Sequence, residues 1–244
     1  MAEAKCLTYP VQLFEDVLNC VALDHTSKVL EVGIGMGQAT APFLNTGCSL
    51  TALDADEKMT AFCNEIFGEN PHFSAVTSRF EEFEGENEVF DLVYSASAFH
   101  EVEQEAGYMK AFSLLKSGGV FVRFSNHAMR AIARPSLSSA LQKLYSIYLP
   151  RTGTPRPYKE AQAQKRAEIA LKYGFTDISY KRYYQTRTYA TEDFLAYLAT
   201  DEDHLQMSET KREAFFNEIR KMLAHYGDKV TLYDTIDLQI AKKP

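Results

Sequence analysis

The sequence has no long apolar run, few cysteines and no secretion signal. None of its 244 residues lies in a stretch approaching the ~20 apolar residues that a membrane span needs. Residues 1–7 have neither a basic flank before an apolar run nor a cleavage site, so we expect a cytoplasmic chain without a membrane partner. The cysteines lack the spacing of disulfide frameworks and metal sites. We therefore expect reduced thiols and no bound metal at Cys6, Cys20, Cys48 and Cys63.

Internal repeats, low-complexity segments and an excess of basic charge are also missing. The formal net charge is −7, which argues against nonspecific nucleic-acid binding as the main activity. The charge is unevenly spread, because residues 151–187 contain nine basic and only three acidic residues. This stretch, with its net charge of +6, is either a solvated basic face or an anion site.

Short apolar strands alternate with amphipathic helices in the first half of the chain. Strands separated by helices indicate parallel βαβ units. The sequence therefore predicts an α/β fold with a doubly wound, mostly parallel, seven-stranded sheet. We expect its first five strands at residues 28–32, 49–54, 73–76, 90–94 and 120–125, with a helix from 104 to 116 that ends at Gly118-Gly119.

The second half is dominated by helical patterns, with two further strands at 177–183 and 229–241. We expect residues 1–127 to form a Rossmann-like core and residues 128–228 to form a helical cap inserted after strand five. The cap region includes the core strand 177–183, and residues 229–244 supply the final core strand. Asp234 interrupts the apolar face of that strand, for which a β-bulge is the simplest explanation.

The most informative motif is a glycine loop between the first strand and the following helix. Gly33, Gly35 and Gly37 alternate there, and glycine allows a ligand to approach the backbone closely. The helix start should also present unpaired N–H groups to the ligand. Dinucleotide enzymes use a similar loop, but Gln38 occupies the position of their third small residue and Glu31 precedes the loop. Both features favour S-adenosylmethionine (SAM) over NAD.

Asp54 ends the second strand, beside the glycine loop in a doubly wound sheet. A carboxylate at this position can accept both hydroxyls of a ribose. The alternative is an N-cap of the next helix, a role that suits Asp56 better.

Together these motifs resemble the class I methyltransferase family, and in particular its branch similar to trans-aconitate methyltransferase. The resemblance is good over residues 9–127 and weaker beyond. It rests on the glycine loop, Asp54, Ser78–Phe83, Phe90–Ser95 followed by Phe99-His100, and Leu115–Gly119. It implies SAM as the cofactor and a small-molecule methyl acceptor.

The resemblance also implies roles for individual residues around the donor. The three glycines would face the methionine part of SAM, and Glu31 would lie near its ammonium group. Asp54 would bind the ribose. At the reactive end, Ser95 would lie close to the sulfonium, while Tyr9 matches an N-terminal lid segment, although a packing role at the helix entry is the alternative.

The adenine would be held by residues that follow the second and third strands. Ala55 and Met59 would pack on its face, and Arg79 and Phe80 match the pair at its edge. Arg79 stands where the family usually has an acidic residue, and arginine carries no acceptor for the exocyclic amine. The backbone N–H of Phe80 remains as the implied contact.

The sequence predicts a methyltransferase that acts on a small and possibly anionic acceptor. His100 follows the fourth strand, where it can orient a nucleophile or take its proton; a structural histidine is the alternative. Nine of the 14 tyrosines lie in residues 145–197 among basic residues, which suits a carboxylate acceptor. At least one inward-facing arginine is then expected among Arg130, Arg134, Arg151, Arg156 and Arg187.

Three other functions fit parts of the same pattern. They are a SAM-binding module without transfer activity, an NAD-dependent oxidoreductase, and an RNA-modifying enzyme that uses the basic stretch. The acidic overall charge and the lack of an RNA-binding appendage argue against the last.

Overall fold

A computed structural model describes residues 8–130, 134–150, 156–200 and 202–244, except for the side chains of 128–130 and 202. The chain divides into two compact units. Residues 8–126, 158–183 and 236–244 form the sheet unit. The described residues between 127 and 157 and between 184 and 235 form the helical unit.

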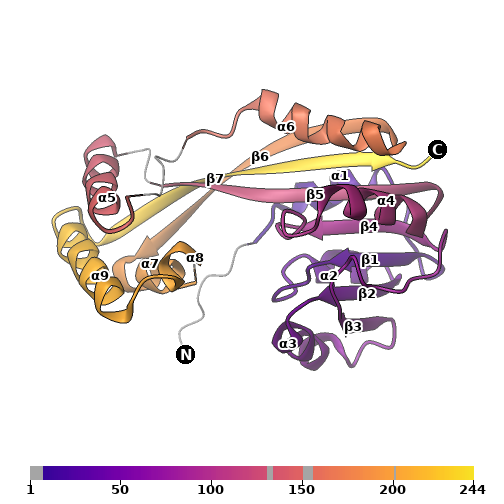
Figure 1. Ribbon diagram of the computed structural model, residues 1–244, viewed down its shortest axis with the longest axis horizontal. Helices are drawn as coiled ribbons and strands as arrows, with labels where there is room; N and C mark the ends of the chain where they lie inside the picture. The colour runs from indigo at the N-terminus through magenta and orange to yellow at the C-terminus, as the bar shows by residue number, and fades with distance from the viewer. Residues whose placement is uncertain (1–7, 131–133, 151–155, 201) are drawn as a thin grey trace. The chain divides into compact units, whose positions relative to one another are not determined.

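The strands form one seven-stranded mixed sheet in the order β3-β2-β1-β4-β5-β7-β6 (Figure 1). The first five strands pair in parallel, each with its neighbours in this order. Gly118 and Gly119, near the start of β5, exchange backbone hydrogen bonds with Lys243, just after the end of β7, so β7 runs antiparallel to β5. The predicted fold class is confirmed. The strands are β1 (Lys28–Val32), β2 (Ser49–Asp54), β3 (Phe73–Thr77), β4 (Phe90–Ala96), β5 (Leu115–Arg130), β6 (Thr176–Ala190) and β7 (Lys229–Lys242).

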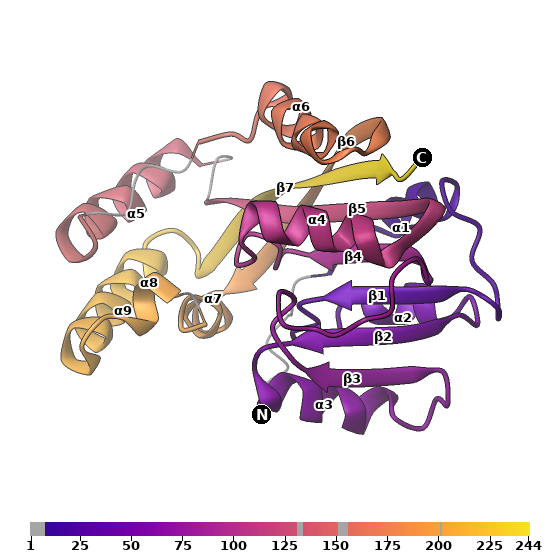
Figure 2. The same ribbon diagram turned by 45° about the vertical axis from the view of Figure 1, so that its right-hand side comes forward.

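Helices cover both faces of the sheet unit. Successive residues of a strand point to opposite faces, so neighbouring residues of β1 pack against different helices. Val29 packs in one apolar cluster with α1 (Val11–Leu18), α2 (Thr40–Leu44) and α3 (Glu57–Phe67). Its neighbour Leu30 packs in the other cluster, which contains residues of α4 (Gln104–Leu114) and η1 (Ile169–Tyr173). In Figure 2, α4 lies in front of the sheet and α1 behind it. The short helix α6 (Glu160–Glu168) leads directly into η1.

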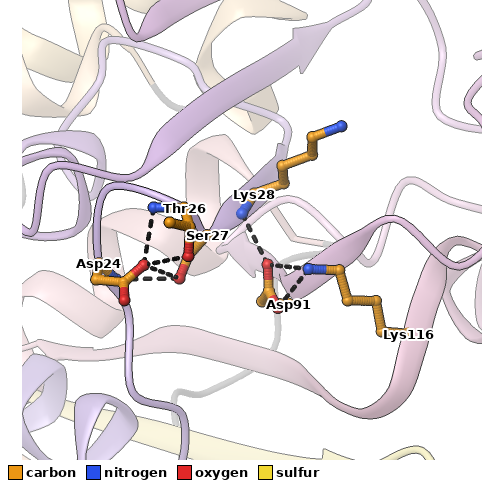
Figure 3. Close-up of polar contacts among 6 residues, drawn as sticks. All are labelled: Asp24, Thr26, Ser27, Lys28, Asp91 and Lys116. Atoms are coloured by element: carbon orange, nitrogen blue, oxygen red, sulfur yellow. Dashed lines mark hydrogen bonds and ion pairs between the residues drawn. The ribbon is translucent and has the colours of Figure 1, made fainter.

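A polar contact fixes the amino ends of three neighbouring strands (Figure 3). The Asp91 carboxylate on β4 accepts the backbone N–H of Lys28 on β1 at 2.8 Å. It also accepts Nζ of Lys116 on β5 at 2.7 and 2.8 Å. These bonds hold the edge of the sheet opposite to the carboxyl ends, where ligands bind in doubly wound folds.

The helical unit has its own apolar core. The helices of this unit are α5 (Pro135–Tyr148), α7 (Thr191–Leu198), α8 (Glu202–Leu205) and α9 (Glu209–Ala224). Apolar residues of α5, α7 and α9 form the core together with Val230 and Leu232 of β7. Asp234 is buried there, and its carboxylate accepts Nε and Nη2 of Arg187 at 2.5 and 3.2 Å. This ion pair accounts for a carboxylate on the buried face of the strand. None of the helices in the described ranges is long and apolar enough to cross a membrane.

The start of β5 differs from the prediction. The strand begins at Leu115, where a helix reaching Lys116 was expected, because Leu115 is fully buried and pairs with Phe90. The two glycines lie within the strand, at an irregularity between the pairs Phe90–Leu115 and Leu92–Val120. Gly118 therefore lies at a register shift within the strand and does not end a helix.

Candidate cofactor site

The glycine loop closes against β2 and the loop after β4. Gly33, Gly35 and Gly37 have φ values of +75°, +53° and +75°, in the left-handed region that favours glycine. A Cβ built on Gly33 would lie 2.2 Å from Cβ of Ala98. A Cβ on Gly37 would lie 2.6 Å from the Phe67 ring. The first and third glycines are therefore required by close packing as well as by backbone conformation.

The backbone N–H groups of this loop already have protein partners. Those of Gly33 and Ile34 both donate to the Leu53 carbonyl at 2.9 Å, and that of Gly37 donates to the Ile34 carbonyl at 3.0 Å. The N–H of Gly35 donates to Oδ2 of Asp54 at 2.9 Å. The loop provides close approach, and its amides hold the site together.

Asp54 links the glycine loop to the start of α3. Besides Gly35, it accepts the backbone N–H of Asp56 through Oδ1 at 2.9 Å. Each carboxylate oxygen has two lone pairs, so both oxygens keep capacity for the two hydroxyls of a ribose. The N-cap of α3 is Asp56, which accepts the N–H of Lys58. The N-cap alternative for Asp54 is thereby excluded.

A cavity of about 430 Å³ lies at the carboxyl ends of four neighbouring strands. Its walls come from segments that follow β3, β2, β1 and β4, which is their spatial order in the sheet. The order of the parallel strands reverses between β1 and β4, and ligands bind at such switch points in α/β folds. The lining residues are Tyr9, Val32–Gly35, Gln38, Leu53–Ala55, Ser78–Glu81, Ala96–Ala98, Glu101 and Val102.

The cavity brings together seven of the twelve predicted site residues and leaves five outside its lining. Of these five, Gly37 packs against Phe67 and Cys63, Met59 is part of α3, and Glu31 is buried on β1. The remaining two are Ser95 and His100. Those that line the cavity are Tyr9, Gly33, Gly35, Asp54, Ala55, Arg79 and Phe80.

Ser97, rather than Ser95, carries the hydroxyl that lines the cavity after β4. The Ser95 hydroxyl is buried and donates to the Val32 carbonyl at 2.7 Å. Ser97 lies beyond the strand with φ of +58°, and its Oγ accepts the Tyr9 hydroxyl at 2.9 Å and the Asn126 N–H at 3.2 Å. Sequence reasoning missed Ser97 because it ended β4 at Tyr94, whereas the strand continues to Ala96.

His100 lies two residues after the lining residue Ala98, and its side chain is 67% exposed. Its Nε2 is 3.9 Å from the Glu101 carboxylate, and Glu101 lines the cavity. The imidazole is thus accessible to a molecule that approaches this end of the cavity. Its catalytic role stays a prediction.

Glu31 is fully buried, and its carboxyl group has few partners. Oε2 accepts the Thr40 hydroxyl at 2.8 Å, while Oε1 has no hydrogen-bond partner among the described residues. Burial raises the pKa of Glu31 to about 8, with a smaller contribution from the Asp54 charge, although the neighbouring Tyr94 and Thr40 hydroxyls oppose the shift.

A pH-dependent stability follows from this shift. The folded chain holds a proton on Glu31 between the ordinary value of 4.5 and about 8, whereas the unfolded chain releases it. The free energy of unfolding therefore falls as pH rises through this window. Glu31→Gln, which imitates the protonated form, should gain on the order of 2–5 kcal/mol over the wild type between pH 5 and pH 9. Urea unfolding of both proteins across this range measures the gain, and parallel profiles would contradict it.

Three of the five candidate arginines have described side chains. Arg134 is exposed and donates to the Tyr226 carbonyl at 2.6 Å, and Arg156 is exposed. Arg187 has an 11% exposed side chain, paired with Asp234 and bonded to the Tyr189 hydroxyl. Its charge is therefore already neutralised by the protein. The side chain of Arg130 and all of Arg151 lie outside the described residues.

Comparisons with known proteins agree with this geometry. A family model described as a methyltransferase domain matches residues 29–119, which include the glycine loop, Asp54 and the segments that follow β3 and β4. An uncharacterized methyltransferase of Anoxybacillus flavithermus is 28% identical over 152 residues, covering 56% of this chain and 70% of its own length. Residues 29–119 thus form a methyltransferase domain, and the sheet has the class I methyltransferase fold.

Solved structures support the same fold for the methyltransferase. A putative type II methyltransferase from Anaeromyxobacter dehalogenans superimposes with a TM-score of 0.68 at 15% identity, covering 96% of this chain and 97% of its own. A phosphoethanolamine N-methyltransferase of Haemonchus contortus, in complex with phosphomonomethylethanolamine and S-adenosylhomocysteine, gives 0.54 at 16% identity and covers 96% and 52%. At these identities the likeness establishes the fold alone.

Proposed function

We propose that this methyltransferase acts on a small molecule, and that the acceptor is anionic and carries a carboxylate. The observation that carries the donor half of this proposal is the cavity at the switch point. In this cavity the two carboxylate oxygens of Asp54, which can accept the hydroxyls of a ribose, lie beside a glycine loop that admits a ligand close to the backbone. The residues present therefore fit SAM.

The protein's contribution to the reaction is placement and exclusion of water. Bound SAM supplies an activated methyl group for an in-line displacement. Asp54 fixes the ribose, and Gly33 with Ala98 shapes the wall beside the reactive end. Ser97 uses its oxygen to accept from Tyr9 and Asn126, so its own O–H is left to donate to a ligand. Positioning of this kind accounts for most of the rate when the donor is already activated.

Three observations support a small anionic acceptor. The acidic overall charge disfavours a nucleic-acid substrate. The Haemonchus contortus structure is in complex with phosphomonomethylethanolamine, which carries a phosphate and an amine, so by analogy it supports a small charged acceptor without favouring a carboxylate over an amine. The motifs of residues 9–127 resemble the trans-aconitate methyltransferase branch, to which we assign the chain within the same proposal. Because Arg187 is neutralised by Asp234, the cation for such an acceptor must be another residue.

A substitution of His100 separates a carboxylate acceptor from an amine or hydroxyl acceptor. An ionised carboxylate has no proton to lose, so His100→Ala should change turnover only a few-fold, whereas loss of a general base typically costs ~100-fold or more. Transfer of a labelled methyl group from SAM to panels of carboxylic acids, amines and alcohols measures this. A product methylated on nitrogen, together with a ~100-fold loss in His100→Ala, would contradict the carboxylate proposal while leaving the SAM-dependent activity intact.

A further inference from the structure

The order of the cavity walls fixes which end of the donor lies where. Asp54 occupies the second wall, between the segment after β3 and the glycine loop after β1. Ribose is the central part of SAM, so adenine and methionine extend to opposite sides of Asp54. Phe80, Leu53 and Val102 supply apolar side chains to the lining, and Phe80 belongs to the β3 side. When SAM is bound, this order would place the flat adenine ring against residues 78–81 and the methionine part toward β1 and β4.

The adenine edge needs a hydrogen-bond acceptor for its exocyclic amine. Arg79 has five donors and no acceptor, and its side chain is 57% exposed. Ser78 uses its hydroxyl hydrogen to donate to the Arg79 carbonyl at 2.9 Å. Glu81 is the one carboxylate in this wall of the cavity among its described lining residues.

The Glu81 carboxylate is held in place by one of its oxygens. Its Oε1 accepts the backbone N–H of Glu103 at 2.9 Å, directly before α4. Its Oε2 lies 3.9 Å from Nε of Arg79, which is beyond hydrogen-bond distance. One oxygen is therefore anchored, and the other keeps its acceptor capacity.

Glu81 is also ionised at neutral pH. Its side chain is 23% exposed, and this partial burial alone would raise its pKa. The Glu103 N–H, the Glu81 N–H and the charges of Arg79 and Lys110 outweigh burial and lower the pKa. Lys110 itself is anchored by donating to the Glu81 carbonyl at 2.8 Å. The site thus keeps a charged acceptor in a partly buried position, where an unpaired or wrongly paired group is costly.

We propose that Oε2 of Glu81 accepts the exocyclic amine of adenine and thereby makes Glu81 the residue that selects a 6-amino purine. The inference rests on SAM binding in the cavity. Glu81 lies two residues after Arg79. Arg79 occupies the position where the resemblance implies an acidic side chain, and Glu81 would supply that carboxylate instead. Glu81 is thus a specificity-determining residue for the donor.

Isothermal titration with two product analogues tests this assignment. S-inosylhomocysteine differs from S-adenosylhomocysteine by carrying a carbonyl oxygen in place of the amine. The wild type should prefer S-adenosylhomocysteine by roughly 10- to 100-fold, the range expected for a hydrogen bond to a charged group. Glu81→Gln should lower that ratio at least ~10-fold, because the amide can donate to the carbonyl oxygen while still accepting from Glu103. Glu82→Gln, an exposed neighbour outside the lining, should keep the wild-type ratio.

The outcomes separate the assignment from the cofactor itself. An equal loss of affinity for both analogues in Glu81→Gln would mean that Glu81 only supports the loop and α4, and would overturn the proposal. Equal binding of both analogues by the wild type would overturn it without any variant. Failure of the wild type to bind either analogue would instead contradict SAM binding in this cavity.

Discussion

Gly33→Ala is expected to lower SAM affinity at least ~100-fold and to destabilise the fold by about 2–5 kcal/mol. Two effects combine. The residue has φ of +75°, where a side chain is strained, and the new methyl group would lie 2.2 Å from Cβ of Ala98. Both residues line the cavity, so relief of the clash moves a wall of the donor site. Calorimetric titration and urea unfolding measure the two effects separately.

Gly118→Ala is the matched control for backbone strain. Gly118 has φ of +78°, but a Cβ there would meet no atom within 4 Å among the described residues. The control should cost about 1–2 kcal/mol from strain alone, with SAM affinity unchanged. If Gly33→Ala behaved like Gly118→Ala in both measurements, the close approach of the glycine loop to the β4–α4 loop would not matter for the site.

Asp54→Ala is expected to weaken SAM binding roughly ten- to a hundredfold. Two hydrogen bonds from ribose hydroxyls to a charged acceptor contribute ~1.5–3 kcal/mol each before water compensates for their loss. The substitution also releases the N–H of Gly35, now held at 2.9 Å. Direct titration of the purified variant with SAM gives the change in dissociation constant.

Asp56→Ala provides the comparison for Asp54. It removes the N-cap of α3, which should cost about 0.5–2 kcal/mol of stability, and it leaves the cavity lining intact. Its SAM affinity should match the wild type. An unchanged dissociation constant in a folded Asp54→Ala variant would show that another carboxylate holds the ribose.

The parallel core could be predicted closely because its signals are local. Lys28–Val32 and Ser49–Asp54 were predicted to the residue, since each is an apolar run bounded by polar or glycine residues. Gly118-Gly119 misled because glycines after a helical pattern usually end a helix. What decides this position is the burial of Leu115 and its pairing with Phe90, and sequence spacing does not reveal that pairing.

Parts of the candidate site depend on contacts between distant residues. Gly33 and Asp54 belong to segments with recognisable motifs, so their neighbourhood could be predicted. The bond between Tyr9 and Ser97 joins residues 88 positions apart, and the anchoring of Glu81 depends on Glu103. Neither contact leaves a local pattern.

The pairing of the basic residues was equally hidden. Arg187 meets Asp234 across 47 positions, and Lys181 meets Asp16. A count of charges along the chain therefore overstates the cationic charge that a substrate can use. The net charge of +6 in residues 151–187 is partly neutralised by acids from elsewhere in the fold.

Calorimetric titration of the wild-type protein with SAM, S-adenosylhomocysteine and NAD tests the central claim most directly. The cavity, Asp54 and the glycine loop predict saturable binding of SAM and S-adenosylhomocysteine, and no response to NAD. Binding of NAD without any response to either SAM species would contradict the assignment of the chain as a SAM-dependent methyltransferase.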